Sequence, residues 1–172
     1  GGCAQSCRWK YHLMDGETEL SDPTNLFSMS SKDLQAVDYI EDFIHMGVAS
    51  LKIEGRMKTA LYVATVARTY RKAIDDYLED PQKYRDNMPW YLDQISNCTY
   101  RQFTTGFYFG KPTEESQIYD SNTYEKDYVY LGITGKADEN GVFDLKQKNK
   151  FSASLCSCYF IISAIILLLP LM

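Results

Sequence analysis

Four charged side chains are gathered between Ser50 and Lys58, where the sequence reads SLKIEGRMK. The candidate catalytic set is Lys52, Glu54, Arg56 and Lys58. Apolar residues over 48–53 predict a short buried strand, and Gly55 ends it in a turn. Active sites of α/β barrels are built at the carboxyl ends of strands, so this position suits catalysis. The alternative is a surface turn whose charges face water.

The chemistry of this set favours binding an anion. On a strand, Lys52 and Glu54 point to the same face, and we expect them to pair because an unpaired buried charge is costly. Arg56, in the turn, can bind a carboxylate or a phosphate through two parallel hydrogen bonds. No nucleophile lies beside the set in the sequence, so an anionic small molecule or an RNA backbone fits it better than peptide hydrolysis.

Two cysteines, Cys3 and Cys7, are separated by three residues. Their thiolates could bind one metal ion or one edge of a cluster if other ligands came from elsewhere. The alternative is two ordinary loop thiols. We assign no ligand role to Cys98, Cys156 or Cys158.

Cations alternate with aromatic rings in Arg8-Trp9-Lys10-Tyr11. Such a stretch could stack on a base and hold a phosphate. A strand with one buried aromatic face is the simpler interpretation, and we favour it. Hydrolytic equipment is sparse: the histidines are His12 and His45, and the sequence has neither H-E-x-x-H nor G-x-S-x-G. We expect His45 to cap a helix or to be partly buried.

Composition limits the class of protein. A chain of 172 residues with 45% hydrophobic content suits one domain or slightly more. The net charge of -5 argues against DNA or RNA binding driven by overall charge. Five cysteines are too few and too uneven for a disulfide scaffold. Since no secretory segment opens the sequence, we expect a cytoplasmic protein.

Hydrophobic spacing predicts helices on both sides of the 48–53 strand. One helix runs from an N-cap at Ser31 to a stop at Gly47, a second covers 59–78, and a third covers 82–95. Helix, strand and helix in this order form an α/β unit.

The pattern changes after Thr99. We expect a turn and a short extended piece over 104–110, a polar linker to about 126, and a strand over 128–134. Asn140-Gly141 predicts a hairpin turn with a returning strand over 142–145. From 155 the chain is apolar, although the run is short for a membrane span and has no basic flank. It is either a membrane anchor or, as we favour, an artefactual tail that does not pack on the domain.

Several strings occur together in the order typical of one family. They are GGCAQSCRWKY, SSKDL, SLKIEGRMK, YVATVARTYRKAIDDY and RQFTTGFYFGKP. Up to about Phe151 the chain therefore resembles the collagenase-like peptidases, peptidase family U32. The resemblance implies an α/β fold that is the C-terminal part of a TIM-like barrel (1–112). A linker and the start of a small β domain (113–154) follow, and then the divergent tail (155–172). It also implies that the chain is the C-terminal portion of a longer protein.

The family resemblance implies several functions. Members are named as peptidases or collagenase-like proteases, whereas others take part in oxygen-independent or prephenate-linked hydroxylation of a tRNA uridine, of ribosomal RNA or of a quinone precursor. The residues present favour tRNA uridine hydroxylation; the alternatives are proteolysis and a non-functional gene fragment. The implied partners are tRNA or a peptide and a related family subunit, with neither DNA nor a membrane.

The resemblance also implies cofactors. An iron–sulfur cluster would take Cys3 and Cys7 as part of its ligands, and prephenate would be a co-substrate. Relatives carry two further ligands upstream, and many have a cysteine after SSKDL, where this sequence has Gln35. The ligand set in this chain is therefore incomplete.

Overall fold

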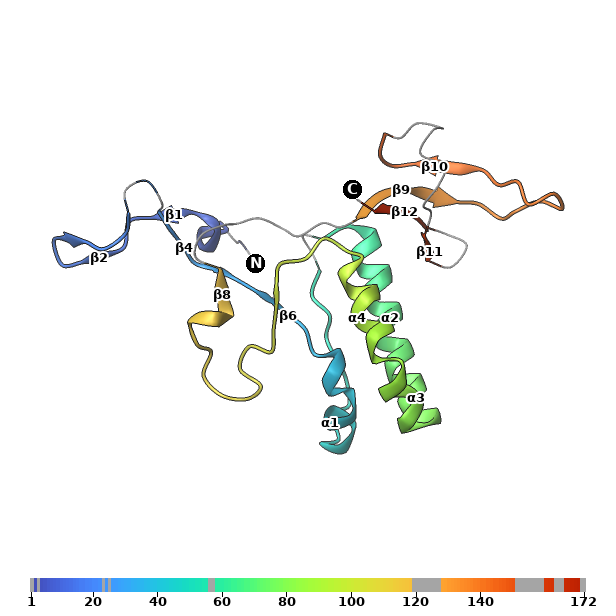
Figure 1. The fold of residues 1–172 in the computed structure, drawn as a ribbon, viewed down its shortest axis with the longest axis horizontal. Coiled ribbons are helices and arrows are strands. Elements are labelled where there is room, and N and C mark those ends of the chain that lie inside the picture. The colour runs from blue at the N-terminus through green and yellow to red at the C-terminus, as the bar shows by residue number, and fades with distance from the viewer. Residues whose placement is uncertain are drawn as a thin grey trace. The chain divides into compact units, whose positions relative to one another are not determined.

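The computed structural model describes residues 2, 4–22, 24, 26–55, 58–118, 128–150, 160–162 and 166–170. Its helices and strands fall into two compact units. The first combines Gly1–Ala36 with Tyr100–Glu125, and the second combines Val37–Thr99 with Lys126–Met172. The mixture of helices and strands agrees with the predicted α/β content (Figure 1).

The first unit is built from short paired strands and single helical turns. The antiparallel pairs are β1 (Lys10–Tyr11) with β4 (Phe27–Ser28), β2 (Met14–Asp15) with β3 (Thr18–Glu19), and β5 (Ser30–Ser31) with β8 (Gln117–Ile118). The parallel pair is β6 (Asp33–Leu34) with β7 (Phe103–Thr104). The 3-10 turns are η1 (Ser6–Arg8) and η3 (Glu114–Ser116).

A largely buried ion pair fixes the β6–β7 region. The Arg101 guanidinium donates to Asp33 Oδ1 from Nε at 3.2 Å and from Nη2 at 2.9 Å. Its Nη1 donates to Ser30 Oγ at 3.0 Å, and the Arg101 backbone N–H donates to Asp33 Oδ2 at 3.0 Å. The two side chains are 14% and 16% exposed, so solvent screens the pair only weakly.

This pairing overturns the predicted helix start. Ser31 lies in β5 and Asp33 in β6 instead of forming a helical first turn. The helix begins later, as η2 (Val37–Tyr39) followed by α1 (Ile40–His45). The partners of Ser31 and Asp33 come from distant parts of the sequence, and a local pattern cannot reveal them.

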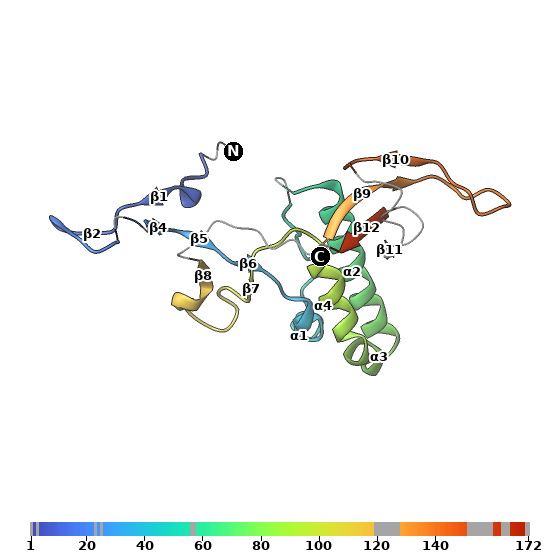
Figure 2. The ribbon, with the colours of Figure 1, turned by 45° about the horizontal axis from the view of Figure 1, so that its top comes forward.

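The second unit contains the long helix α2 (Ala60–Glu79), followed by α3 (Pro81–Asp86) and α4 (Met88–Ser96). In Figures 1 and 2, α4 lies alongside α2. The prediction for 59–78 is confirmed, and Thr59 caps α2 by accepting from the Tyr62 backbone N–H at 3.3 Å. The helix predicted over 82–95 is instead two helices, because Pro89 has no N–H with which to continue the first one.

Tyrosine rings pack against one another in the core of the helical part. The Tyr84 ring lies edge-on to Tyr77, with centroids 5.7 Å apart, and stacks on Tyr91 at 5.9 Å. The Tyr84 hydroxyl donates to the Val37 carbonyl at 2.8 Å. Burial raises the pKa of Tyr84 to about 12, so the phenol stays protonated and keeps this bond at neutral pH.

A buried carboxylate, Asp76, joins the three helices. It accepts hydrogen bonds from Lys72 Nζ at 2.7 Å and from the Tyr91 hydroxyl at 2.6 Å. Asn87 Nδ2 donates to it at 3.1 Å, and Lys83 Nζ lies 3.1 Å away. Burial alone would raise the pKa of Asp76, but these donors hold it well below its usual range.

The remaining strands form a four-stranded antiparallel sheet in the order β10-β9-β12-β11 (Figure 2). β9 (Tyr128–Thr134) matches the predicted strand, and the predicted turn has a left-handed glycine at Gly141, with φ of 78°. The returning strand begins later than predicted, as β10 (Leu145–Gln147).

The apolar tail contributes two strands, β11 (Phe160–Ile162) and β12 (Ile166–Pro170). β12 pairs with β9, so the expectation that the tail stays unpacked is wrong for its described residues. Strand propensity is high in this Ile- and Leu-rich segment, and β9 offers it an otherwise open edge.

Candidate functional site

The predicted strand over 48–53 is not a regular strand. Within the described ranges no strand pairs with it, and the Val48 backbone N–H donates to the Phe43 carbonyl at 2.9 Å. A strand is stabilised by hydrogen bonds to neighbouring strands, and the 48–53 segment has no neighbouring strand in the described part of the chain. Two apolar side chains of the segment remain accessible: Val48 is 45% exposed and Ile53 is 38% exposed.

A glycine turn connects this segment to α2. The Lys58 backbone N–H donates to the Gly55 carbonyl at 2.8 Å. A Cβ at position 55 would lie 3.1 Å from the Tyr62 ring, so a larger residue would push the ring away. Close packing therefore favours glycine here, and the turn brings Lys58 directly to the start of α2.

Lys58, one of the predicted site residues, is held by contacts with other parts of the second unit. Its half-buried ammonium donates to the Thr99 carbonyl at 3.1 Å and lies 4.9 Å from the centre of the Tyr62 ring. The carbonyl and the ring face both attract a cation. Lys58 is thus positioned by the protein instead of extending freely into solvent.

Cys98 precedes Thr99, and from the sequence we assign it no ligand role. Its thiol is buried in the structure. Only 3% of it is exposed. Burial raises the pKa of the Cys98 thiol, although the Thr65 hydroxyl and the Lys58 charge act in the opposite direction. A protonated, buried thiol is a poor nucleophile and a poor metal ligand.

The structure gives less information on the positions of Lys52, Glu54 and Arg56, the other members of the predicted catalytic set. Lys52 and Glu54 lie exposed in the extended segment. Arg56 lies outside the described residues. The structure therefore places Lys58 against α2 and Lys52 and Glu54 on accessible backbone, and the assembly of all four stays a prediction.

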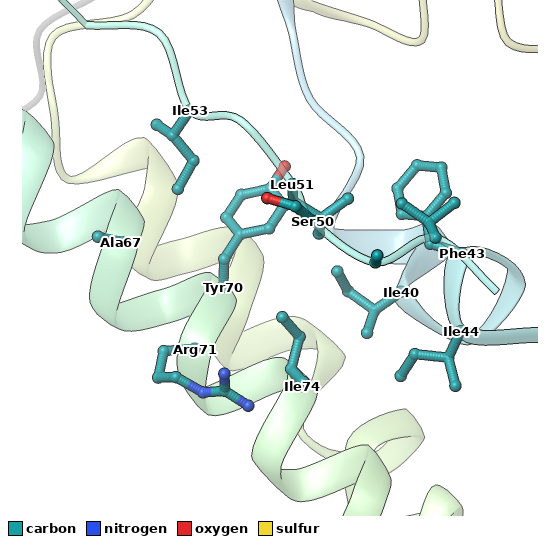
Figure 3. A pocket seen from close by; sticks show the side chains of 12 residues that line it. Ile40, Phe43, Ile44, Ser50, Leu51, Ile53, Ala67, Tyr70, Arg71 and Ile74 are labelled. Atoms are coloured by element: carbon teal, nitrogen blue, oxygen red, sulfur yellow. The ribbon is translucent and has the colours of Figure 1, made fainter.

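An apolar cavity of about 410 Å³ lies beneath the extended segment. In Figure 3, Ile40 from α1 and Ile74 from α2 point into the space between the helices, and Tyr70 extends toward Ser50 and Leu51. The lining is mostly hydrocarbon and offers contact for apolar side chains, and its polar groups come from Ser50, Tyr70 and Arg71. The cavity lies where the strand of an α/β unit would pack against its helices.

The candidate cluster ligands are only partly described. Cys7 is an exposed thiol in η1, whereas Cys3 lies outside the described residues. Position 35, where the family resemblance led us to expect a cysteine, holds a buried Gln35 whose backbone N–H donates to the Thr104 carbonyl at 3.0 Å. The described residues contain no group of three or more potential metal ligands, so on their own they do not fit a complete cluster.

The histidines have structural partners. His45 ends α1, and its Nε2 lies 3.0 Å from the Tyr77 hydroxyl. His12 Nδ1 contacts the Glu19 carboxylate. Within the described chain neither histidine contacts a serine or a cysteine, so the geometry offers no hydrolytic pair there.

The exposed aromatic residues were not anticipated. Phe107 and Phe109 are 78% and 71% exposed, and Trp9 is 56% exposed. Exposure of Trp9 overturns the preferred interpretation of Arg8-Trp9-Lys10-Tyr11 as a strand with a buried aromatic face. A sequence signal existed for the other two: three aromatics confined between Gly106 and Gly110 in a turn cannot all reach a core.

Comparison with known proteins identifies the family. A family model described as peptidase family U32 matches residues 1–118. The chain belongs to this family. No solved structure matches it. In the described part of the chain, helices of the length and apolar character required to cross a bilayer are absent.

Curated U32 relatives carry two kinds of name. tRNA hydroxylation protein P1 of Bacillus subtilis (strain 168) is 40% identical over 157 residues, covering 88% of this chain and 37% of that protein. tRNA hydroxylation protein P of Haemophilus influenzae is 36% identical, covering 78% of this chain and 29% of that protein. Collagenase of Porphyromonas gingivalis is 37% identical, covering 77% of this chain and 37% of that protein. The chain thus spans about a third of the length of these relatives.

Proposed function

We propose that this U32 protein takes part in the hydroxylation of a uridine in tRNA. The observation that carries the proposal is the 40% identity with tRNA hydroxylation protein P1 along 88% of the chain. Since the chain spans 37% of that relative, the activity is proposed for the complete protein to which the chain corresponds.

We also propose that the chain forms part of a TIM-like barrel. α1, the extended 48–53 segment and α2 follow one another in the order of a barrel repeat. The parallel pairing of β6 with β7 across a helical connection supports the same architecture. In a completed barrel the 48–53 segment would gain strand partners and cover the apolar cavity.

In this proposal Arg56 and Lys58 bind an anion, either an RNA phosphate or a carboxylate co-substrate such as prephenate, and Glu54 holds Lys52 or Arg56 in place. Lys58 already shows a fixed position, through Thr99 and Tyr62. A cluster held partly by Cys3 and Cys7 would supply redox chemistry when bound. The cationic side chains of the 52–58 segment would bind the anionic groups.

Peptide hydrolysis is the second candidate, because two relatives from Porphyromonas gingivalis are named collagenase. The described residues offer it little support, since His12 pairs with Glu19 and His45 with Tyr77. A non-functional gene fragment is the third.

Mass spectrometry of tRNA separates these candidates. The gene is deleted from its natural host, and the tRNA nucleosides are compared with those of the parent strain and of a strain in which the gene is restored. Our proposal expects loss of hydroxyuridine in the deletion and its return on restoration. Unchanged hydroxyuridine contradicts it. In that case, cleavage of denatured collagen by the purified protein would favour the peptidase, and no cleavage would favour the fragment.

A further inference from the structure

A short turn in the first unit presents three consecutive aromatic side chains to solvent. Phe107 is 78% exposed, Tyr108 49% and Phe109 71%. The turn follows β7 in the loop that leads to β8 (Figure 2). Contiguous exposed apolar surface in a soluble protein commonly marks a binding site.

Backbone geometry holds this turn in place. Gly106 has φ of +57°, and its N–H donates to Thr104 Oγ1 at 3.1 Å. The Tyr108 N–H donates to the Thr105 carbonyl at 3.2 Å, which closes the first half of the turn. The exposure of the rings therefore follows from a defined turn.

The second half of the turn is closed in the same way. The Gly110 N–H donates to the Phe107 carbonyl at 3.4 Å, and Gly110 has φ of +141°, a conformation that side chains rarely allow. A Cβ at Gly106 would meet Leu34 Cδ1 at 3.1 Å, and Leu34 is itself 58% exposed. Leu34 thus packs close to the turn and extends its apolar surface.

The chemistry of the turn suits unpaired nucleobases. Aromatic rings stack on base faces without regard to sequence, and rings already held in a turn lose little freedom when they bind. Lys111 follows directly and is exposed, so its ammonium can contact a neighbouring phosphate. Loops of folded RNA present bases in this accessible form.

We infer that the turn Gly106–Gly110 binds unpaired bases of RNA by stacking on Phe107 and Phe109, with Lys111 contacting the adjacent backbone. The inference rests on the proposed function and deepens it, because it identifies a surface for the single-stranded loop of the tRNA. It involves a different part of the chain from the cationic 50–58 segment.

Fluorescence anisotropy with the full chain tests this inference. The probe is a labelled RNA stem–loop with unpaired uridines, and the comparison RNA is the same sequence in a fully paired duplex. Phe107→Ala and Phe109→Ala should each weaken binding to the stem–loop about five- to a hundredfold. Phe107→Trp should retain it. Binding to the duplex should be weak in every case.

A control variant and a variant of the cationic contact make the result specific. Phe143→Ala removes an aromatic ring that is 40% exposed elsewhere in the chain and should leave binding unchanged. Lys111→Ala should weaken binding and lower the dependence of log K on log salt by about one unit. Circular dichroism of each variant should match the wild type, because Phe107 and Phe109 lie largely in solvent and Phe143 is 40% exposed.

Several outcomes would overturn the inference. Equal affinity of wild type and Phe107→Ala for the stem–loop would remove the turn from RNA binding while leaving tRNA hydroxylation untouched. Absence of stem–loop binding by the wild type, or self-association of the chain that Phe107→Ala abolishes, would assign the turn to another role. Failure of the proposed function shows separately, as unchanged hydroxyuridine in the deletion strain.

Discussion

Asp76 stabilises the packing of the helices in the second unit, a role that its position in the sequence does not reveal by itself. It is 3% exposed, and its donors come from α2, from α3 and α4 and from the Asn87 junction between those two. The signal that could have revealed it is its spacing: Asp76 lies seven residues after the buried Thr69, on the inner face of α2. Removal of its charge should therefore loosen the helical part of the second unit.

Asp76→Asn should lower the free energy of unfolding by about 1.5–3 kcal/mol, because hydrogen bonds to a buried charge are lost. Asp75→Asn is the matched control: Asp75 is 61% exposed and pairs with Arg71, so its loss should cost less than about 1 kcal/mol. Urea unfolding monitored by circular dichroism gives both values. Equal effects of the two variants would contradict the role of Asp76.

The same residue predicts an acid dependence. The pKa of Asp76 is depressed in the folded state, so its contribution to stability is complete above the unfolded value of about 4 and is lost as pH falls below it. The wild type should therefore lose more stability than Asp76→Asn between about pH 4 and pH 2. Parallel pH profiles would show that Asp76 does not titrate as we infer.

Arg56 is the residue on which the proposed anion site depends most. Arg56→Ala in the complete protein should lower tRNA hydroxylation about tenfold or more, because a charge-assisted contact contributes about 1.5–3 kcal/mol. Arg56→Lys should restore little, since a point charge cannot make two parallel hydrogen bonds. Arg85→Ala, which removes an exposed cation paired with Glu41, is the control and should have no effect. Nucleoside mass spectrometry provides the readout; full hydroxylation by Arg56→Ala would exclude Arg56 from the site.

At the scale of elements, the β9–β10 pairing depends on one close approach. A Cβ at Gly132 would lie 2.7 Å from the Lys146 carbonyl oxygen and 2.8 Å from Leu145 Cδ1. Backbone atoms cannot move away as a flexible side chain can. Gly132→Ala should therefore destabilise the pairing by about 1–3 kcal/mol.

Gly135→Ala provides the matched control for this element. At Gly135 the nearest atom to an added Cβ is the Asp144 carbonyl oxygen at 3.6 Å, an ordinary contact. Hydrogen exchange of the β9 and β10 amides should become faster in Gly132→Ala and stay unchanged in Gly135→Ala. Equal protection in both variants would show that the strands do not pair in this register.

Elements defined by local signals could be predicted, and those defined by distant partners could not. The apolar spacing over 59–78 predicted α2, and the strand-like composition of 128–134 predicted β9. The helix start at Ser31 failed because Ser31 pairs with Gln117. The charge of Lys58 was evident in the sequence, whereas its contact with Thr99, 41 residues away, was not.

At the scale of the whole molecule, the chain spans 37% of the length of tRNA hydroxylation protein P1 of Bacillus subtilis. The 48–53 segment lacks strand partners in the described part of the chain, and the described residues supply Cys7 as a candidate cluster ligand. Our proposal of an iron–sulfur cluster held partly by Cys3 and Cys7 therefore expects further ligands from outside the described residues.

Iron content of the complete protein tests this view. Purified without oxygen, it should contain iron and acid-labile sulfide, and Cys3→Ser or Cys7→Ser should lower both, because each removes a thiolate that an iron–sulfur cluster requires. Cys98→Ala removes a buried thiol whose raised pKa disfavours metal binding, so it should leave the iron content unchanged. A complete protein that hydroxylates tRNA without iron would exclude the cluster, and equal iron loss in Cys98→Ala and Cys7→Ser would assign the loss to unfolding instead of ligation.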